Sequence, residues 1–174
     1  MLKAKTNVVL VGPMGTGKTT IGRLLARELQ FEFRDSDREI EERCGADIPW
    51  IFDVEGEEGF RAREKVVIED LAKQSDIVLA TGGGAIVEPE NQQVLRKNGF
   101  VVFLNTSVEQ QYERTRRDRK RPLLQHQDPK PVLRELMAVR EPIYRALADF
   151  TISTESRRPR NVVKEIIRAI DRAK

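Results

Sequence analysis

The chain has 174 residues, of which 39% are hydrophobic and 34% are charged. This length and composition predict one globular domain over 1–174 and exclude a disordered or collagen-like chain. The longest apolar runs, such as 100–104, are far shorter than the roughly 20 residues of a membrane-spanning helix, so we expect no contact with a membrane. The first residues carry no long apolar stretch and Cys44 is the single cysteine, which together predict a cytoplasmic protein.

The charge of the chain is mild overall but unevenly distributed. Lys and Arg number 31 and Asp and Glu 28, which leaves a net charge of +3. The segment 113–121, ERTRRDRKR, holds six basic and two acidic residues. Because a nucleic-acid-binding protein usually spreads basic charge over a whole face, this concentration predicts a local anionic ligand and no nucleic acid.

Short apolar runs alternate along the chain with segments of helical periodicity. Strands are expected at 7–11, 32–35, 77–80, 101–104 and 150–152, and helices at 18–30, 60–73, around 94–95, 132–148 and 162–170. This alternation predicts an α/β fold with a parallel sheet covered on both faces. Two segments interrupt it: an acidic one around 38–59 and a basic, proline-rich one around 111–131. Both are interpreted as insertions over the edge of the sheet.

A phosphate-binding loop follows the first strand. Residues 12–19, GPMGTGKT, match the pattern G-x-x-x-x-G-K-[ST] between an expected strand and an expected helix. Glycines at Gly12, Gly15 and Gly17 would let backbone N–H groups approach phosphate oxygens. Lys18 would reach the β- and γ-phosphates and Thr19 would bind Mg²⁺. Thr16 and Thr20 are assigned to the same ATP site.

Several further patterns fit a site for the group that accepts the phosphate. Asp35 and Asp37 follow the second expected strand and, two residues apart on extended chain, would share one face. One carboxylate would then serve the metal and the other an acceptor hydroxyl, or both would cap a helix. Arg61 and Glu64 lie three apart on a helix, as a positioned guanidinium or as a surface ion pair. The glycines Gly82, Gly83 and Gly84 predict close contact between backbone and ligand, or a simple tight turn.

The basic segment and two later arginines complete the candidates. Beside a phosphate-binding loop, the run that ends at Arg121 favours a lid that neutralises phosphate charge over a solvated helix end. Arg140 stands near a helix interrupted by a proline and is expected to face the site. Arg157 and Arg158 follow the last strand, where a nucleotide base would bind. In contrast, His126 is expected to be solvated, and Trp50 and Phe52 to pack the acidic insertion.

Taken together these segments resemble the shikimate kinase family, in its gammaproteobacterial form, over essentially the whole chain. The matching segments are LVGPMGTGKTTIGRLLA, DSD at 35–37, GEEGFRAREKVV, LATGGGAIV, RDRKRPLL and VREPIYRALAD. The phosphate-binding loop is shared by many families, whereas the order DSD, FRxxE, GGG, RPLL and RxPxY is far more specific.

The resemblance implies a three-layer P-loop kinase fold with a five-stranded parallel sheet of order 2-3-1-4-5. It implies an acceptor-binding helical insertion over about 33–61 and a lid over about 112–130. The implied activity is an ATP-dependent transfer of the γ-phosphoryl group to the 3-hydroxyl of shikimate in aromatic amino-acid biosynthesis, by an enzyme expected to be a monomer.

The resemblance also assigns roles to individual residues. Asp37 would bind the acceptor hydroxyls and either take up the proton of the 3-hydroxyl or only orient that hydroxyl. Asp35 would support Mg²⁺, and Arg61 and Arg140 would hold the acceptor carboxylate. Gly82–Gly84 would touch the acceptor ring and the γ-phosphate. Arg121 would reach the phosphates, Arg114 would stack on adenine, and Arg158, or one of Arg157 and Arg160, would contact the base.

Two other functions are compatible with parts of the pattern. Another small-molecule kinase, for gluconate or a nucleoside monophosphate, would share the fold and the loop. A monophosphate acceptor would ask for more cationic residues than the acidic segment 38–59 offers. A nucleotide switch or nucleic-acid binder would use the basic run but leave DSD, Arg61 and Arg140 without a role.

Overall fold

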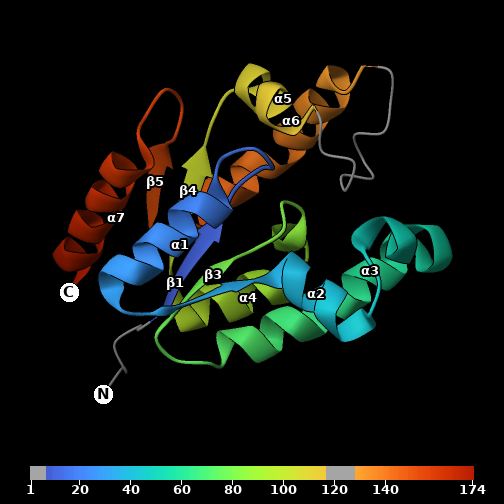
Figure 1. Ribbon diagram of the computed structural model, residues 1–174, viewed down its shortest axis with the longest axis horizontal. Coiled ribbons are helices and arrows are strands. Elements are labelled where there is room, and N and C mark those ends of the chain that lie inside the picture. Colours follow the sequence, from blue (N-terminus) through green and yellow to red (C-terminus); the bar gives the residue numbers. More distant parts are fainter. Residues whose placement is uncertain (1–6, 117–127) are drawn as a thin grey trace.

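The computed structural model describes residues 7–116 and 128–174. Its centre is a five-stranded sheet that is fully parallel, as the alternation of elements predicted, and has the order β2-β3-β1-β4-β5 that the resemblance implied. The strands are β1 (Asn7–Val11), β2 (Glu32–Asp35), β3 (Ile77–Ala80), β4 (Gly99–Asn105) and β5 (Phe150–Ser153). Figure 1 shows the helices on either side of this sheet, which gives the three layers of the predicted fold.

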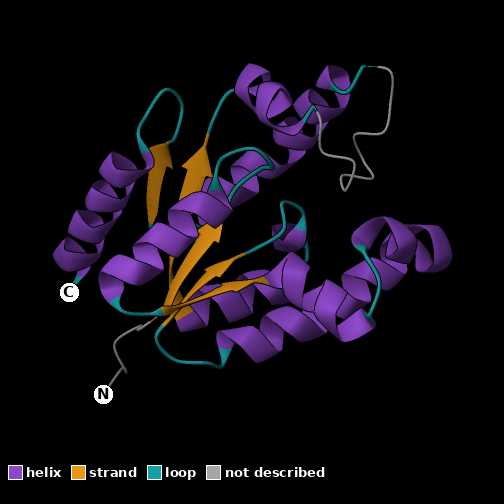
Figure 2. Cartoon of the chain, viewed as in Figure 1, coloured by secondary structure: helices purple, strands orange, loops and turns teal. Residues whose placement is uncertain are grey.

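Alternating side chains of the strands form two separate cores. In β1, Val8 and Leu10 face α1 (Lys18–Leu29) and α7 (Pro159–Ala173), whereas Val9 and Val11 face the opposite helices. Those opposite helices are α3 (Ile48–Ala72), α4 (Pro89–Asn98) and α6 (Lys130–Leu147), together with the short 3-10 helix η1 (Ala85–Val87). Both faces of the sheet are therefore buried, as Figure 2 illustrates, and its ligands must bind at the ends of the strands.

The acidic insertion folds as two helices that continue directly from β2. The first, α2 (Ser36–Cys44), ends at Gly45, and the second, α3, starts twelve residues before the expected helix at 60. Asp47 caps α3 by accepting a hydrogen bond from the Trp50 amide at 3.0 Å. The backbone leaves helical geometry at Gly56, with φ 74°, so α3 is two helical segments joined by a kink.

The two aromatic residues of this insertion behave differently. Phe52 packs against the core and lies 5.0 Å from Phe60, measured between ring centroids. The expectation that Trp50 packs the insertion is wrong, because its side chain is 49% exposed. It stands in the first turn of α3, on the outer side of the helix.

The chain on both sides of the basic segment is helical. α5 (Val108–Thr115) precedes it, and α6 follows it as one helix through Pro142. Residues 117–127, including Arg121 and His126, lie outside the described residues, so the lid and solvated-histidine predictions are untested there. Within the described ranges, every helix is too short or too polar to cross a membrane.

Candidate active site

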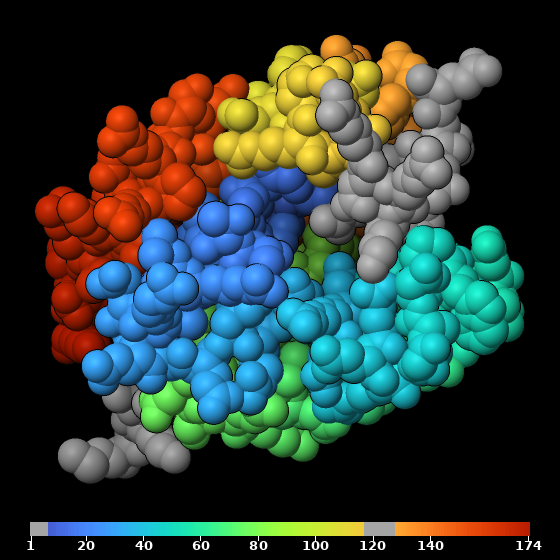
Figure 3. Space-filling model, viewed as in Figure 1, coloured from blue at the N-terminus to red at the C-terminus, as the bar shows by residue number. Residues whose placement is uncertain are grey.

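A cavity of about 230 Å³ opens at the carboxyl ends of β1, β2 and β3. It is visible in Figure 3 as a hollow between the blue atoms of α1, the cyan atoms of α2 and α3, and the yellow atoms of α5. Its walls are the phosphate-binding loop, the end of β2, the turn after β3 and Arg114. The motifs found separately in the sequence therefore meet in one place.

The phosphate-binding loop has the backbone geometry that its glycines predict. Gly12, Gly15 and Gly17 have φ values of 147°, 81° and 87°, which side-chain-bearing residues rarely adopt. A Cβ at Gly12 would clash with the Leu104 carbonyl, and one at Gly15 would lie 3.0 Å from the Gln111 Cα. The glycines thus allow the loop to pack against the end of β4 and against α5 while its N–H groups remain available to phosphate.

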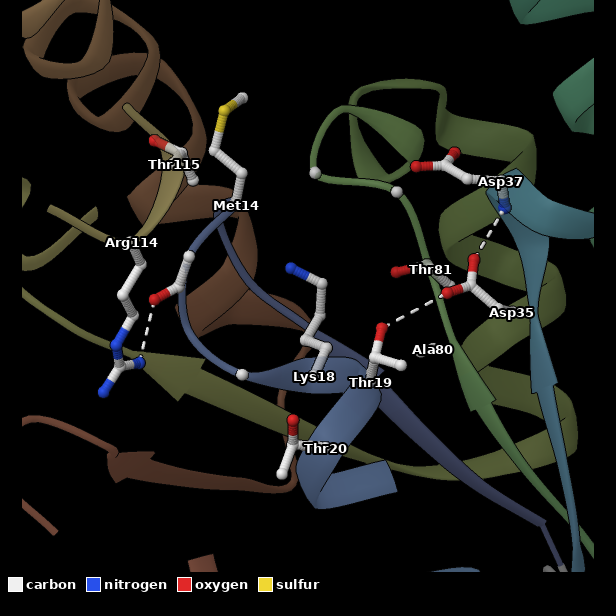
Figure 4. Close-up of a pocket in the computed structure, with 14 residues that line it drawn as sticks. Met14, Lys18, Thr19, Thr20, Asp35, Asp37, Ala80, Thr81, Arg114 and Thr115 are labelled. Carbon is white, nitrogen blue, oxygen red and sulfur yellow. Dashed lines mark hydrogen bonds between the residues drawn. The ribbon is translucent and has the colours of Figure 1, made fainter. Parts of the chain in front are cut away.

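Lys18 lies across this loop. Its Nζ donates hydrogen bonds to the carbonyls of Gly12 and Pro13, both at 2.7 Å. Figure 4 shows the side chain extending from the start of α1 into the cavity. The ammonium group is therefore placed where the helix N-terminus and the loop favour an anion.

Of the three threonines of the motif, one stabilises the loop and two line the cavity. Thr16 is fully buried and donates to the Pro13 carbonyl at 3.1 Å, so it stabilises the loop and is not among the residues that line the cavity. Thr19 and Thr20 do line the cavity. The sequence had grouped all three together because side-chain direction within a loop cannot be derived from the motif.

The sequence suggested that the two aspartates lie on one extended strand, and this expectation is wrong. Asp35 ends β2 and is the N-cap of α2, accepting hydrogen bonds from the amides of Asp37 at 3.0 Å and Arg38 at 3.3 Å. Asp37 lies in the first turn of that helix. Both nevertheless line the cavity, so Asp35 caps the helix and also borders the cavity.

Thr19 and Asp35 form a pair of oxygen donors suited to Mg²⁺. The Thr19 hydroxyl lies 3.5 Å from Asp35 Oδ2 (Figure 4). Within the described ranges, no three His, Cys, Asp or Glu residues are grouped to hold a metal ion by themselves. This fits Mg²⁺, which is commonly held by one or two protein oxygens together with phosphate oxygens.

A second, smaller cavity adjoins the first and contains the acceptor candidates. Four residues line both cavities: Met14, Asp37, Gly82 and Gly83. The second is also lined by Ile48, Phe52, Phe60, Arg61, Glu64, Gly84 and Arg140. Asp37 thus stands at the junction between the phosphate side and the acceptor side.

Two guanidinium groups converge in this second cavity over Gly84. A Cβ there would clash with Arg61 Nη2 and would lie 2.7 Å from Arg140 Nη2. Arg140 is only 7% exposed, and burial and the nearby Arg61 charge both lower its pKa. Two like charges held this close favour an anion between them. Gly83 and Gly84 do form a turn, and the missing side chain of Gly84 also makes room for both arginines.

Glu64 forms an ion pair with one of these guanidinium groups, that of Arg61. Its Oε1 lies 2.8 Å from Arg61 Nη1, and its side chain is fully buried, which rules out a surface ion pair. The pKa of Glu64 is raised to about 7, mainly by burial and in part by the Asp37 charge, while the Arg61 charge acts to lower it. A Cβ at Gly82 would lie 2.6 Å from Asp37 Oδ1 and 3.2 Å from Glu64 Oε2, so both carboxylates lie against that glycine.

The predicted nucleotide-binding arginines have different positions. Arg114 lines the first cavity and donates from Nη1 to the Gly15 carbonyl at 2.9 Å. Arg158 is exposed at the N-cap of α7 and is not among the residues lining that cavity. Arg157 forms an ion pair with Glu165, and Arg160 lies in a separate groove between α1 and α7.

Sequence reasoning assigned no role in the site to several residues that line or support it, and it had given Phe52 only a packing role. Ile48, Phe52 and Phe60 form an apolar wall of the acceptor cavity, and Met14 borders both cavities. Ser36 and Tyr144 contact the glycine turn directly. Both had stood inside quoted motifs, DSD and RxPxY, which was the available signal for them.

Comparisons with known proteins agree with this geometry. The family model described as shikimate kinase matches residues 14–171. A shikimate kinase from Hahella chejuensis is 70% identical over 169 residues, covering 97% of this chain and 88% of the relative. One from Pseudomonas aeruginosa is 59% identical over 161 residues, covering 92% of this chain and 94% of the relative. These relatives also confirm the predicted gammaproteobacterial form.

Solved structures lead to the same family. The shikimate kinase of Acinetobacter baumannii in complex with shikimate superposes with a TM-score of 0.96 at 50% identity, covering 99% of this chain and 97% of the other. A gluconokinase from Sinorhizobium meliloti superposes with a TM-score of 0.58 at 14% identity, covering 97% of this chain and 93% of the other, which shows a shared fold alone. On its sequence, its fold and the arrangement of its site, the chain belongs to the shikimate kinase family.

Proposed function

We propose that this chain transfers the γ-phosphoryl group of ATP to the 3-hydroxyl of shikimate, giving shikimate 3-phosphate and ADP. The observation that carries the proposal is the pair of guanidinium groups over Gly84, one cavity away from the phosphate-binding loop. Two converging cations suit a carboxylate. The apolar wall of Ile48, Phe52 and Phe60 suits the carbon ring that bears it.

The nucleotide side supplies positioning and positive charge. The loop amides and Lys18 bind the phosphates, and Thr20 and Arg114 complete the walls of the ATP cavity. Thr19 and Asp35 would hold Mg²⁺, which would neutralise phosphate charge. Arg121, assigned to the phosphates by the resemblance, and Arg158, assigned to the base, remain predictions. These groups lower the barrier mainly by holding the reactants and compensating their charge.

The acceptor side orients the attacking hydroxyl. Arg61 and Arg140 bind the acceptor carboxylate, and the Gly82–Gly84 turn supports the ring. Asp37, at the junction of the two cavities, accepts the hydrogen bond of the 3-hydroxyl and orients its oxygen toward the phosphate. It takes up the hydroxyl proton as the new P–O bond forms and the bond to ADP breaks. The proposed arrangement explains why one carboxylate borders both cavities.

A panel of acceptors tests the proposal. ADP release with Mg²⁺ and ATP would be measured with shikimate, quinate, gluconate, AMP, CMP and no acceptor. We expect strong stimulation by shikimate alone. Stimulation by gluconate or a nucleoside monophosphate instead would retain the fold and the phosphate-binding loop but overturn the assignment of Arg61 and Arg140.

The same assay addresses the non-enzymatic alternative. If nucleotide bound and no acceptor stimulated turnover, a nucleotide switch would replace the kinase proposal. A nucleic-acid binder would instead show an affinity for DNA or RNA that falls steeply with salt. Size-exclusion chromatography with light scattering would test the expectation of a monomer.

A further inference from the structure

The glycine turn after β3 is held by two hydroxyl groups, one on each side. The Gly82 amide donates to Ser36 Oγ at 3.1 Å, from the start of α2. The Tyr144 hydroxyl donates to the Gly83 carbonyl, from the last turns of α6. Two elements from opposite sides of the acceptor cavity therefore determine the position of this turn.

Tyr144 is anchored on the central sheet. Its side chain is fully buried, and its ring stacks on Phe103 of β4 with centroids 4.9 Å apart and an interplanar angle of 24°. Burial raises the pKa of the Tyr144 hydroxyl, so the group is a neutral phenol at physiological pH. Stacking on the sheet thereby fixes the position of a neutral hydroxyl next to the glycine turn.

Arg140 lies one helical turn before Tyr144, on the same face of α6. A Cβ at Gly83 would lie 3.4 Å from Arg140 Nη1 and 3.7 Å from the Tyr144 hydroxyl oxygen, so both groups lie beside one backbone atom. Burial lowers the pKa of Arg140, and the neighbouring Tyr144 oxygen acts in the opposite direction. Because a carbonyl can only accept, the phenol proton points to Gly83 and the phenol lone pairs remain for Arg140.

The two acceptor arginines are thus held by different kinds of group. Arg61 is paired with the carboxylates of Glu64 at 2.8 Å and Glu57 at 3.5 Å, which compensate its charge. Among the residues that the structure describes, no carboxylate oxygen lies within 4.0 Å of the Arg140 guanidinium. Glu57 and Glu64 act on the Arg140 charge only from beyond that distance. The polar group that lies beside the guanidinium on α6 is the neutral hydroxyl of Tyr144.

We propose that Tyr144 is a positioning residue, whose neutral hydroxyl aligns Arg140 and the Gly83 carbonyl so that the full charge of Arg140 meets the anionic group of the acceptor. The inference rests on the proposed function, because the anion in question is the shikimate carboxylate. Arg61 then orients the carboxylate, and Arg140 supplies most of the net attraction.

The test is Tyr144→Phe, which keeps the ring and its stacking on Phe103 and removes only the hydroxyl. Turnover is compared with shikimate and with its methyl ester, which lacks the negative charge. We expect the KM for shikimate to rise about tenfold, the size expected for losing one hydrogen bond to a charged group. The KM for the ester and the KM for ATP should change by less than about twofold, since neither depends on the charge of Arg140.

Two further variants separate alignment of Arg140 from general loosening of the turn. Ser36→Ala frees the other end of the turn without touching Arg140, so the preference for shikimate over the ester should be retained. Tyr112→Phe removes the hydroxyl of the other tyrosine of the chain, on α5, and should leave all kinetic constants as in the wild type.

The outcomes are distinct. An unchanged preference for the acid over the ester in Tyr144→Phe would overturn the inference, as would an equal change in Ser36→Ala or equal losses for ATP and shikimate. A wild-type enzyme that did not use shikimate would overturn the proposed function as well. A selective loss for the acid in Tyr144→Phe alone supports the alignment of Arg140.

Discussion

The two halves of the site are built in different ways. The nucleotide half is largely one continuous segment, 12–20, whose backbone does much of the binding and whose Thr19 and Thr20 are exposed. The acceptor half brings together Asp37, Arg61, Gly84 and Arg140 from distant parts of the chain and buries most of their charge. A local motif suffices for phosphate, whereas selective binding of a small anion depends on packing between several elements.

The largest effect is expected from breaking the nucleotide half at one point. Lys18→Ala removes the ammonium group that compensates phosphate charge, so we expect kcat to fall by at least about 10²–10³-fold. Binding of shikimate alone, measured by calorimetry, should be retained, because Lys18 does not line the acceptor cavity. Lys97→Ala, on the exposed side of α4, is the matched control, and retained activity in Lys18→Ala would contradict the assignment.

The junction between the halves is tested by Asp37→Asn. The amide keeps the size of the side chain but cannot take up the hydroxyl proton, so kcat should fall by about 10²–10⁴-fold. The KM for ATP should stay within about twofold. A defect confined to ATP binding would move Asp37 to the nucleotide half.

Burial of charge in the acceptor half predicts a specific dependence of stability on pH. The pKa of Glu64 is raised from 4.5 to about 7 in the folded protein, so between these values the folded state holds a proton that the unfolded state has released. The contribution of Glu64 to the free energy of unfolding is therefore present below pH 4.5 and falls as pH rises toward about 7, by about 3 kcal/mol.

Denaturant unfolding of the wild type and Glu64→Gln across this range measures the effect. The glutamine does not titrate, so the difference in unfolding free energy between the two proteins should shift in favour of the variant as pH rises. Parallel pH profiles would mean that Glu64 is ionised throughout and compensated fully by Arg61.

Arg140→Ala sharpens the contrast from the acceptor side. Loss of a charge-assisted contact to a carboxylate should raise the KM for shikimate by about 10–100-fold. The KM for ATP should change little, since Arg140 does not line the nucleotide cavity. Equal losses for both substrates would make Arg140 a structural residue.

The smallest effect is expected at the far end of the nucleotide half. Arg158 is exposed outside the cavity, so its predicted contact with the base would be open to solvent, and Arg158→Ala should raise the KM for ATP by only about twofold. Arg114→Ala, which removes a side chain that lines the cavity and contacts Gly15, should have the larger effect. A greater loss in Arg158→Ala would show that this arginine reaches the base when ATP binds.

The periodicity of the sequence determined most of the helices and strands. The order of the strands in the sheet followed only from the resemblance to a known family. The strand at 77–80 and the closing helix were predictable because each buries a regular pattern of apolar side chains. The start of α3 was not predictable from the sequence, because this acidic and only mildly amphipathic helix, interrupted at Gly56, lacks a regular apolar pattern. The phosphate-binding loop was predictable because its function depends on neighbouring backbone groups.

Only the tertiary structure decided how the acceptor half is arranged. Local spacing suggested that Asp35 and Asp37 share a strand face, whereas packing starts a helix at Ser36 and makes Asp35 its cap. Burial turned the Arg61–Glu64 spacing from an ordinary ion pair into an internal one. Tyr144 acquired its contact with Gly83, 61 residues away in sequence, because α6 packs against β4 and against η1, which follows the glycine turn. Side-chain burial and long-range contacts depend on how distant segments pack, and no local pattern contains that information.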